Sequence, residues 1–392
     1  MPGSAVFVHH EQSLNYRFHD NHPFHPVRLQ LTLDLLTELG ALDTAHLIEP
    51  RPASEEELRW IHQPTYIEAV KKLSVLSPDP AWISRAEQYG LLDEDTPYFH
   101  GMHEATSHVV GGTIAAMEAV LSGASTHALH MAGGLHHALS GKAAGFCIYN
   151  DVAVAIAYAQ RQYGARVLYV DTDVHHGDGV QWSFYSDPDV CTYSIHETGK
   201  YLFPGTGFVQ ERGEHHGYGA CLNIPLQPYT EDGSWMECFE ESVRRLVDHY
   251  KPDLIVSLHG CDAHALDPLS HMYCSMSIYQ EMPAILHELA HTYCEGRWVA
   301  VGGGGYDFWR VVPRAWSLLW LEMSQHPLKS SLHQFPGERL PEAWISKWQS
   351  QAPVPLPTHW LDDLSHWSDI PRRAEITAKN REMLAVALQD YP

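Results

Sequence analysis

The chain has 392 residues, 44% of them hydrophobic, so it can bury a large core in one α/β domain or in two smaller ones. Its formal net charge of −23 argues against a nucleic-acid partner, because phosphates are bound by basic patches. The seven cysteines contain no C-x-x-C pair, which favours reduced thiols and a cytoplasmic location. The first residues lack the layout of a signal peptide and no apolar run is long enough to span a bilayer, so we expect no membrane partner.

Strands and helices are predicted to alternate along most of the chain. The first strand covers residues 5–8 and the first long helix 28–39, and between 50 and 100 short helices alternate with proline breaks. Further strands are predicted at 126–131, 166–170, 190–195, 221–224, 253–258 and 298–301. Longer helices are predicted at 106–121, 151–163, 234–250, 277–294 and 308–324. This alternation indicates a single open, mostly parallel, doubly wound α/β sheet with helices on both faces.

The last part of the chain, residues 326–392, differs in composition. It is rich in proline and tryptophan, contains the segment PVPLP at 353–357, and ends in a predicted helix over 373–388. We interpret residues 1–325 as the main domain. Residues 326–392 are then a C-terminal appendage packed on this domain, without a catalytic role of their own.

The segment from Tyr169 to Gly179 is the most informative part of the sequence. It begins as a buried strand and turns abruptly into carboxylates, imidazoles and glycines. Alternate side chains of a strand point the same way, so Asp171, Asp173 and His175 share one face. Asp173 and His175 are therefore placed to bind one metal ion. A solvated acidic turn is the alternative for this segment taken alone, but unpaired charges at a strand end are costly to bury.

Polar groups also follow the other predicted strands. His136 and His137 come after strand 126–131, Asp262 after strand 253–258, and Tyr306 with four preceding glycines after strand 298–301. In an open α/β sheet, ligands bind beyond the carboxyl ends of the strands, so these groups should meet at one edge. Taken singly, the paired histidines suit an ordinary loop and the glycines a tight turn. Their convergence favours one functional site.

The chemistry that fits these groups is metal-assisted hydrolysis. Asp173, His175 and Asp262 would be three protein ligands and would leave a position open for water and substrate, as a catalytic zinc ion requires. Tyr306 would donate a hydrogen bond to the oxyanion of the transition state.

The adjacent histidines suit proton transfer at the same site. Either His136 or His137 could take a proton from water and return it to a leaving amine. Each imidazole needs a carboxylate to fix its tautomer, and Asp171 and Asp178 are available for this.

A second metal motif is weaker. The sequence HELAH at 287–291 matches the H-E-x-x-H pattern of zinc peptidases. A chance match is unsurprising in a chain with 29 histidines. The predicted helix that contains it precedes a strand and would cover the sheet away from the strand ends, so we do not expect a catalytic metal there.

Several motifs together resemble the zinc-dependent histone deacetylase family. They are GGLHHA at 133–138, GFCIYND at 145–151, DTDVHHGDG at 171–179, FPGTG at 203–207 and GGGGY at 302–306. The resemblance runs in order from about residue 15 to about residue 325. The segments NYRF at 15–18, 20–28, GCDAHALDPL at 260–269 and PRRAEI at 371–376 are most similar to the bacterial acetoin-utilisation deacetylases.

The resemblance implies an arginase/deacetylase-type fold, with residues 1–325 as the deacetylase catalytic domain. It also implies a metal-dependent protein lysine deacetylase that hydrolyses acetyl-lysine amides to lysine and acetate. The expected partner is an acetylated protein, such as the metabolic enzyme acetyl-CoA synthetase. The expected ion is Zn2+, with Fe2+ as the alternative in cells, and K+ is expected as a second cofactor.

The resemblance also assigns roles by motif position. Zn2+ would be bound by Asp173, His175 and Asp262, and Tyr306 keeps its transition-state role. His137 would be the general base and acid, backed by Asp178, with His136 assisting, backed by Asp171. Substrate would contact Asp95, Gly145, Phe146, Phe203 and Leu269. One potassium site would use Asp171, Asp173, His175, Ser194 and Ile195, and a second one Phe184, Asp187 and Val190.

Three other functions compete with this one. A manganese ureohydrolase of the arginase type shares the fold, but its two-metal site requires an aspartate two residues after the histidine, where this chain has Gly177. A non-enzymatic acetyl-lysine reader would have lost a ligand or the tyrosine. An acetylpolyamine hydrolase, or another amidohydrolase of small amides, remains the alternative. The sequence does not indicate the oligomeric state.

Overall fold

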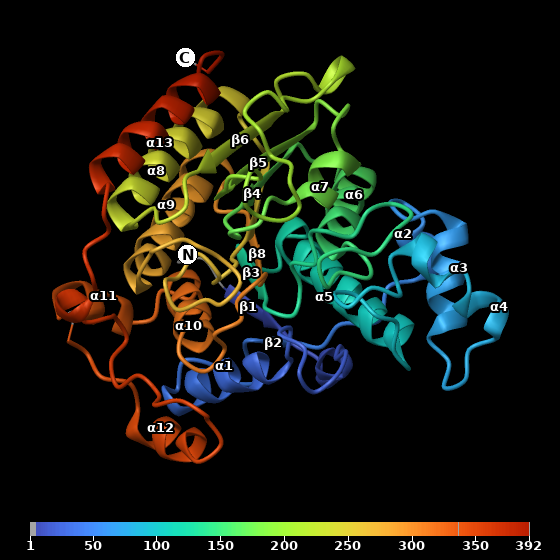
Figure 1. The fold of residues 1–392 in the computed structure, drawn as a ribbon, viewed down its shortest axis with the longest axis horizontal. Coiled ribbons are helices and arrows are strands. Elements are labelled where there is room, and N and C mark those ends of the chain that lie inside the picture. Colours follow the sequence, from blue (N-terminus) through green and yellow to red (C-terminus); the bar gives the residue numbers. More distant parts are fainter. Residues whose placement is uncertain (1–4, 336, 392) are drawn as a thin grey trace.

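The computed structural model describes residues 5–335 and 337–391. Within these residues, eight strands form one open sheet in the order β2-β1-β3-β8-β7-β4-β5-β6, and every pairing is parallel (Figure 1). The strands are β1 Ala5–Val8, β2 Leu47–Ile48, β3 His127–His130, β4 Val167–Asp171, β5 Val190–Glu197, β6 Cys221–Leu226, β7 Leu254–Leu258 and β8 Trp298–Val301. The predicted single parallel α/β sheet is confirmed. The two-residue edge strand β2 was not predicted.

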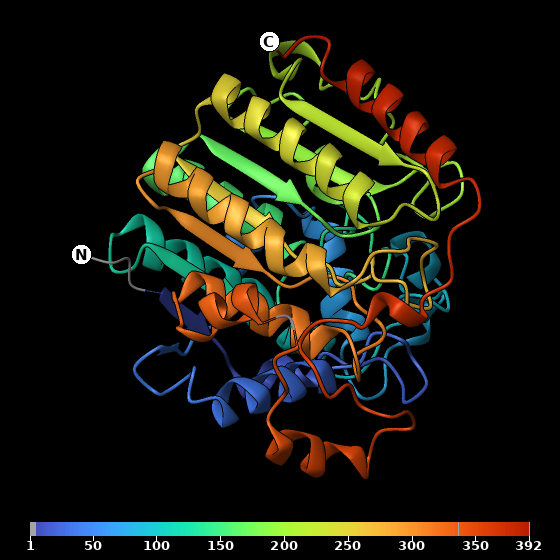
Figure 2. The same ribbon diagram turned by 90° about the vertical axis from the view of Figure 1, so that its left-hand side faces the viewer.

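Helices cover both faces of this sheet. On one face, α5 (Met102–Leu121) packs on β1, β3 and β8, and α6 (Asp151–Tyr163) packs on β4. The other face is covered by α1 (Val27–Glu38), α8 (Asp232–Tyr250), α9 (Met276–Tyr293) and α10 (Val312–Met323). Figure 2 shows α8 and α9 in front of the strands on this face, running roughly along them. The sheet is therefore doubly wound.

Side-chain alternation along the strands divides the core into two apolar layers. In β4, Val167 and Tyr169 join the cluster beneath α5 and α6, whereas Leu168 and Val170 join the cluster beneath α8, α9 and α10. All four side chains are at most 1% exposed. Burying an apolar side chain of this size stabilises the fold by about 1.5–3 kcal/mol, so a strand that is apolar on both faces belongs in the middle of such a sheet.

The register of the strands brings their carboxyl ends to one edge. Asp171, the last residue of β4, pairs with Leu258 at the end of β7. Leu258 pairs with Val301 at the end of β8, and Val301 pairs with His130 at the end of β3. The loops that follow these four strands therefore leave the sheet side by side.

The remaining helices lie in the connections and in the tail. They are α2 Glu55–Leu58, α3 Pro64–Leu73, α4 Pro80–Ile83, α7 Asp178–Ser183, α11 Leu328–Gln334, α12 Glu342–Gln349 and α13 Arg373–Ala387, with short 3-10 helices at Glu11–Asn15, Ala86–Tyr89, His215–Gly217 and Leu364–His366. Helix α10 begins at 312 and not at 308 as predicted, with a proline in its first turn, where the missing N–H is tolerated. No helix of the described residues combines the length and the apolar character needed to cross a membrane.

The C-terminal segment contacts the rest of the chain along its length. Helix α12 packs on α1, and α13 packs on β6 and α8, as Figure 1 shows for α13 and α8. The indole Nε1 of Trp344 donates to the carbonyl of Leu31 over 2.9 Å. Trp344 and Trp360 are fully buried. The tryptophans of this segment thus contribute to the hydrophobic cluster that also includes α1, α8, α9 and α10.

Candidate active site

Two carboxylates and one imidazole meet beyond the ends of β4 and β7. The Nδ1 atom of His175 lies 3.1 Å from Oδ1 of Asp173 and 3.1 Å from Oδ2 of Asp262. All three side chains are buried. Their donor atoms lie within 4.8 Å of one another, and such a set can bind a metal ion.

Backbone groups hold these ligands in place. The amide of His175 donates to Oδ1 of Asp173, the amide of Val174 to Oδ1 of Asp262, and the amide of Gly304 to Oδ2 of Asp173. A Cβ atom at Gly304 would lie only 2.1 Å from Oδ2 of Asp262. Position 304 therefore requires glycine, because any side chain would displace the carboxylates of Asp262 and Asp173.

The charges of this group favour a bound cation. Burial and the neighbouring Asp173 raise the pKa of Asp262 to about 6. Burial opposes a charge on His175, yet Asp173 and Asp262 outweigh it and raise the pKa of this imidazole to about 10. Metal binding through His175 requires the neutral imidazole, and the two buried carboxylates then leave a net negative charge that a divalent metal ion neutralises. The donor set of two oxygens and one nitrogen fits zinc, which takes Asp and His ligands.

Two histidine–carboxylate pairs lie next to this group. The Nδ1 atom of His136 is 2.7 Å from Asp171 Oδ2, and the Nδ1 atom of His137 is 2.7 Å from Asp178 Oδ1. A carboxylate accepts, so each Nδ1 donates. The Nε2 of His137, whose ring lines the cavity, remains free, whereas the Nε2 of His136 lies 3.9 Å from Asp173 Oδ1. The hydroxyl of Tyr169 also donates to Asp171 Oδ2 over 2.5 Å.

The two imidazoles differ in their electrostatic surroundings. Burial, together with the positive charges of His136 and His175, lowers the pKa of His137 well below its ordinary value. At His136 burial acts in the same direction, but Asp171 and Asp173 outweigh it and raise the pKa to about 9. At neutral pH His137 is therefore the neutral imidazole of the two, and its Nε2 keeps a lone pair.

The start of α6 positions the loop that contains both histidines. Asn150 caps this helix by accepting from the amide of Ala153, and its side-chain nitrogen donates to the carbonyls of His136 and Ala138. Asp151 accepts from the backbone amides of residues 134 and 135. The helix cap and the histidine loop are thus one hydrogen-bonded unit.

A cavity of about 220 Å³ opens onto these groups. Its walls are formed by Asp95, His137, Gly145, Phe146, His175, Leu202, Phe203, Leu269 and Tyr306. A Cβ atom at Gly145 would lie 2.4 Å from the His137 ring, so this position also requires glycine. The Phe203 ring packs edge-on against the His137 ring, with 4.9 Å between centroids. The cavity is therefore a mainly apolar channel with polar groups at its inner end.

Tyr306 and Asp95 lie on this channel. The amide of Tyr306 donates to Asp267 Oδ2 over 2.8 Å, and its ring packs edge-on against Phe146. Burial and the nearby Asp262 and Asp173 raise the pKa of the Tyr306 phenol well above its ordinary value, so it stays protonated and can donate. Asp95 is exposed at the rim, where its backbone carbonyl is 3.0 Å from His22 Nε2.

The residues expected to bind potassium fall at two places along β5. Asp171 and Ser194 are register partners on β4 and β5, and Ile195 follows. At the other end of β5, the amide of Asp187 donates to the carbonyl of Phe184, and Val190 begins the strand. The first set thus adjoins the candidate metal ligands, and the second lies at the amino end of the strand.

The structure explains why a second ligand of the arginase type is absent from the described residues of this site. A Cβ atom at Gly177 would lie 2.0 Å from Asp171 Oδ2. An aspartate at this position would displace Asp171 from its bond with His136. Asp178, one residue later, instead faces His137.

Three contributions to the site were missed in the sequence. Tyr169 could have been found, because it shares a strand face with Asp171. No feature of the sequence points to Leu202 as part of the site, except that it precedes Phe203. Arg28 is buried, and its guanidinium donates to the carbonyl of Gly303 over 2.7 Å, which supports the glycine loop. Only the fold brings this residue of α1 to the loop after β8.

The H-E-x-x-H match lies elsewhere. His287 and His291 are on α9, as expected away from the carboxyl ends of the strands. Glu288 is exposed and forms a bidentate ion pair with Arg244. The glutamate that a zinc peptidase uses as its base is therefore turned away from the histidines.

Comparisons with known proteins agree with this geometry. The histone deacetylase domain family matches residues 22–323. The acetoin utilization protein AcuC of Bacillus subtilis (strain 168) is 52% identical over 384 residues, which cover 98% of this chain and 96% of that protein. AcuC of Staphylococcus xylosus is 47% identical over 382 residues, covering 97% and 96%.

Solved structures give the same result. The crystal structure of a histone deacetylase homologue from Aquifex aeolicus superposes with a TM-score of 0.81 at 27% identity, covering 98% of this chain and 99% of that one. A histone deacetylase homologue complexed with SAHA has a TM-score of 0.82 at 28% identity, with the same coverage. The chain therefore belongs to the histone deacetylase family.

Proposed function

We propose that this chain, a deacetylase of the histone deacetylase family, is a zinc-dependent hydrolase that removes acetyl groups from lysine side chains of proteins. The observation that supports this most is the channel of about 220 Å³, whose walls include His175, His137 and Tyr306. An extended acyl-lysine side chain fits a mainly apolar channel with polar groups at its inner end. The scissile amide would then lie beside all three residues.

The metal would be held by Asp173, His175 and Asp262. The negative charge of this buried group supports a dication, and Zn2+ suits its oxygen and nitrogen donors, with Fe2+ as the alternative in cells. When bound, such an ion polarises the amide carbonyl and lowers the pKa of water. The negative charge of the buried carboxylates likewise supports a K+ ion near Asp171 and Ser194.

The remaining steps belong to side chains of this protein. His137, held by Asp178 in the tautomer with a free Nε2, would take a proton from the attacking water and return it to the lysine amine. His136, held by Asp171, would assist from the neighbouring position. Tyr306 would donate its hydroxyl hydrogen to the oxyanion that forms on the carbonyl oxygen.

The substrate would be a protein and not a free polyamine. Asp95 lies at the rim of the channel, where a carboxylate can accept backbone N–H bonds from a peptide. The relatives are named for acetoin utilization, which supports a metabolic enzyme such as acetyl-CoA synthetase as the target.

Metal removal tests this function. The full chain, freed of metal by a chelator, should not cleave an acetyl-lysine peptide, and added Zn2+ should restore cleavage. Asp262→Asn should stay inactive at the same Zn2+ concentration, because it removes a ligand charge. Asp369→Asn, the same change at a side chain that is 99% exposed, should behave as the wild type. Cleavage by the metal-free chain, or by Asp262→Asn, would refute the proposal.

A further inference from the structure

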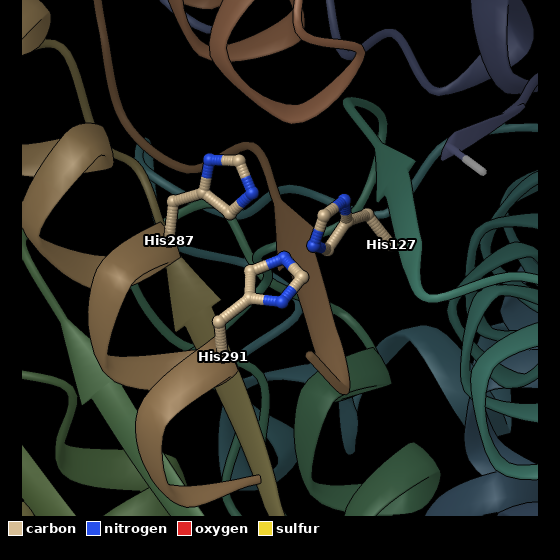
Figure 3. A group of neighbouring side chains, drawn as sticks. All are labelled: His127, His287 and His291. Atoms are coloured by element: carbon tan, nitrogen blue, oxygen red, sulfur yellow. The ribbon is translucent and has the colours of Figure 1, made fainter. Parts of the chain in front are cut away.

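Three histidines meet near the amino-terminal ends of the strands, on the side of the sheet opposite to the active site. His127 is the first residue of β3, whereas the catalytic loop follows the last residue of this strand. His287 and His291 lie one turn apart on α9 and face His127 (Figure 3). The ring centroids are 4.7 Å apart for His127 and His287, 5.2 Å for His127 and His291, and 4.8 Å for His287 and His291.

Hydrogen bonds turn the Nε2 atoms of two rings toward the cluster. The Nδ1 atom of His127 lies 3.1 Å from the carbonyl of Met323, which can only accept, so this Nδ1 donates. The Nδ1 atom of His287 lies 2.6 Å from Oε1 of Glu322. A neutral imidazole that donates from Nδ1 has its lone pair on Nε2. A carboxylate or carbonyl behind the imidazole is the usual arrangement of metal-binding histidines.

The Nε2 atom of His127 has no hydrogen-bond partner within the described residues. The residue is 0% exposed, so bulk solvent does not reach this atom. Leaving a buried polar atom unpaired is costly, and native proteins rarely do so without a reason. Simple ring packing would explain the contacts of the three imidazoles but not this unsatisfied atom.

We propose that His127, His287 and His291 bind a divalent transition-metal ion, separate from the catalytic one. One nitrogen from each ring lies within 4.8 Å of the others. Zn–N bonds of about 2.0–2.1 Å place tetrahedral nitrogens about 3.3 Å apart, so the rings must close slightly around the ion. His291 is exposed and can rotate, and solvent can enter past it to supply the fourth ligand. Three imidazoles suit Zn2+, Ni2+ and Cu2+ better than Mg2+ or Ca2+.

The neighbourhood of His291 leaves room for this closure. Gly296 follows α9 in a left-handed conformation, with φ 83°. A Cβ atom at this position would lie 2.9 Å from Cε1 of the His291 ring, so glycine keeps the space free.

The ion would join β3 to α9, which are far apart in the sequence. Glu322 and Met323, at the end of α10, hold the outer nitrogens of His287 and His127, so three elements would be linked through one ion. Because an unfolded chain cannot present these ligands together, metal binding stabilises the folded state. The expected role is structural, since Glu288 is paired with Arg244 and cannot act as a base here.

Zinc stoichiometry of the full chain tests the site. The metal-free protein is loaded with Zn2+, desalted and analysed by mass spectrometry for zinc. The wild type should hold two ions per chain and the variant His287→Ala with His291→Ala one. Asp262→Asn should also hold one, because it loses only the catalytic ion. His366→Ala, which removes a histidine with an 87% exposed side chain, should keep two and controls for loose surface binding.

A melting experiment covers the case in which the double variant does not fold. In the Asp262→Asn background, added Zn2+ should raise the midpoint of thermal unfolding, and the single change His291→Ala at the exposed ligand should abolish this rise. A wild type with one zinc ion, a double variant that still holds two, or an unchanged zinc-dependent rise with His291→Ala would overturn the proposal. These readouts do not depend on deacetylase activity, so they stand apart from the test of the proposed function.

Discussion

The Nδ1 atom of His137 lies 2.7 Å from a carboxylate oxygen of Asp178, and the same imidazole forms part of the wall of the channel. This contact sets which ring nitrogen has the proton and therefore which one can act on substrate. Asp178 itself begins the short helix α7, directly after the loop that contains the proposed ligands Asp173 and His175. The order of residues along this loop thus links the proposed ligand His175 to the carboxylate behind the proposed base.

The first prediction concerns this pair. Asp178→Asn keeps the shape but loses the charge, so His137 can adopt the wrong tautomer and its imidazolium is less stable. We expect kcat for an acetyl-lysine peptide to fall about 10- to 100-fold, the scale for partners of site histidines. Zinc content and KM should change little. Asp369→Asn is the matched control, and an unchanged kcat for Asp178→Asn would remove Asp178 from the site.

The second prediction concerns Tyr306. Its phenol stays protonated, and its ring is held beside Phe146 on the channel wall. Tyr306→Phe should lower kcat by about a hundredfold or more, because one donor to the oxyanion is lost. KM should hardly move, since the hydrogen bond forms mainly in the transition state. A variant with a higher KM and an unchanged kcat would instead assign Tyr306 to ground-state binding.

The third prediction separates protein from polyamine substrates. Asp95 can accept backbone N–H groups of a peptide but meets a polyamine only as a screened, distant cation. Asp95→Asn should therefore weaken turnover of an acetyl-lysine peptide far more than turnover of acetylspermidine. The exposed neighbour Asp93 is not part of the channel wall, so Asp93→Asn serves as the rim control. Equal losses on both substrates, or faster wild-type turnover of the polyamine, would move this enzyme to the polyamine class.

The fourth prediction concerns how the C-terminal segment is held. Asp362 lies 2.9 Å from Nε2 of His264 and 2.9 Å from the buried Arg314, and it accepts from the amide of Met276. Burial raises the pKa of this carboxyl, but His264 and Arg314 outweigh it and hold the pKa well below its ordinary value. The carboxylate thus joins the segment after residue 325 to α9 and α10.

The sign of the pH effect follows from this shift. A lowered folded-state pKa contributes stability that is fully present above the unfolded pKa of about 3.9 and is lost as the pH falls toward the lower folded value. Asp362→Asn should cost about 3–5 kcal/mol at pH 7, because it leaves Arg314 buried without its partner. The difference from the wild type should shrink as the pH drops below about 4. Chemical unfolding of both chains at pH 7 and at lower pH measures this.

The adjacent Asp363 is the control for that experiment. Its side chain is 71% exposed and it caps only a short 3-10 helix. Asp363→Asn should change the unfolding midpoint far less than Asp362→Asn at pH 7. Equal effects of the two substitutions would show that Asp362 does not hold the segment.

The local sequence pattern was sufficient to predict the central strands and to predict which of the loops after them meet. Strand β4 is apolar on both faces from Val167 to Val170, and its period and length predict a buried parallel strand. Parallel strands put their carboxyl ends on one edge, so the convergence of Asp173, Asp262 and Tyr306 could be expected from their order alone. The helix predicted at 373–388 is present as α13, whereas the two-residue strand β2 and the short tail helices α11 and α12 were missed, because short elements have little periodic signal and depend on the surface that they cover.

The sequence by itself thus determined the sheet, the edge at which the polar loops gather and the family resemblance, because these depend on residues close together in the chain. Only the tertiary structure placed Arg28 behind the glycine loop and His127 against His287 and His291. These contacts join segments that are far apart along the chain, and no periodicity encodes them. They arise because α1 and α9 pack on one face of the sheet and bring their side chains against residues from distant parts of the chain.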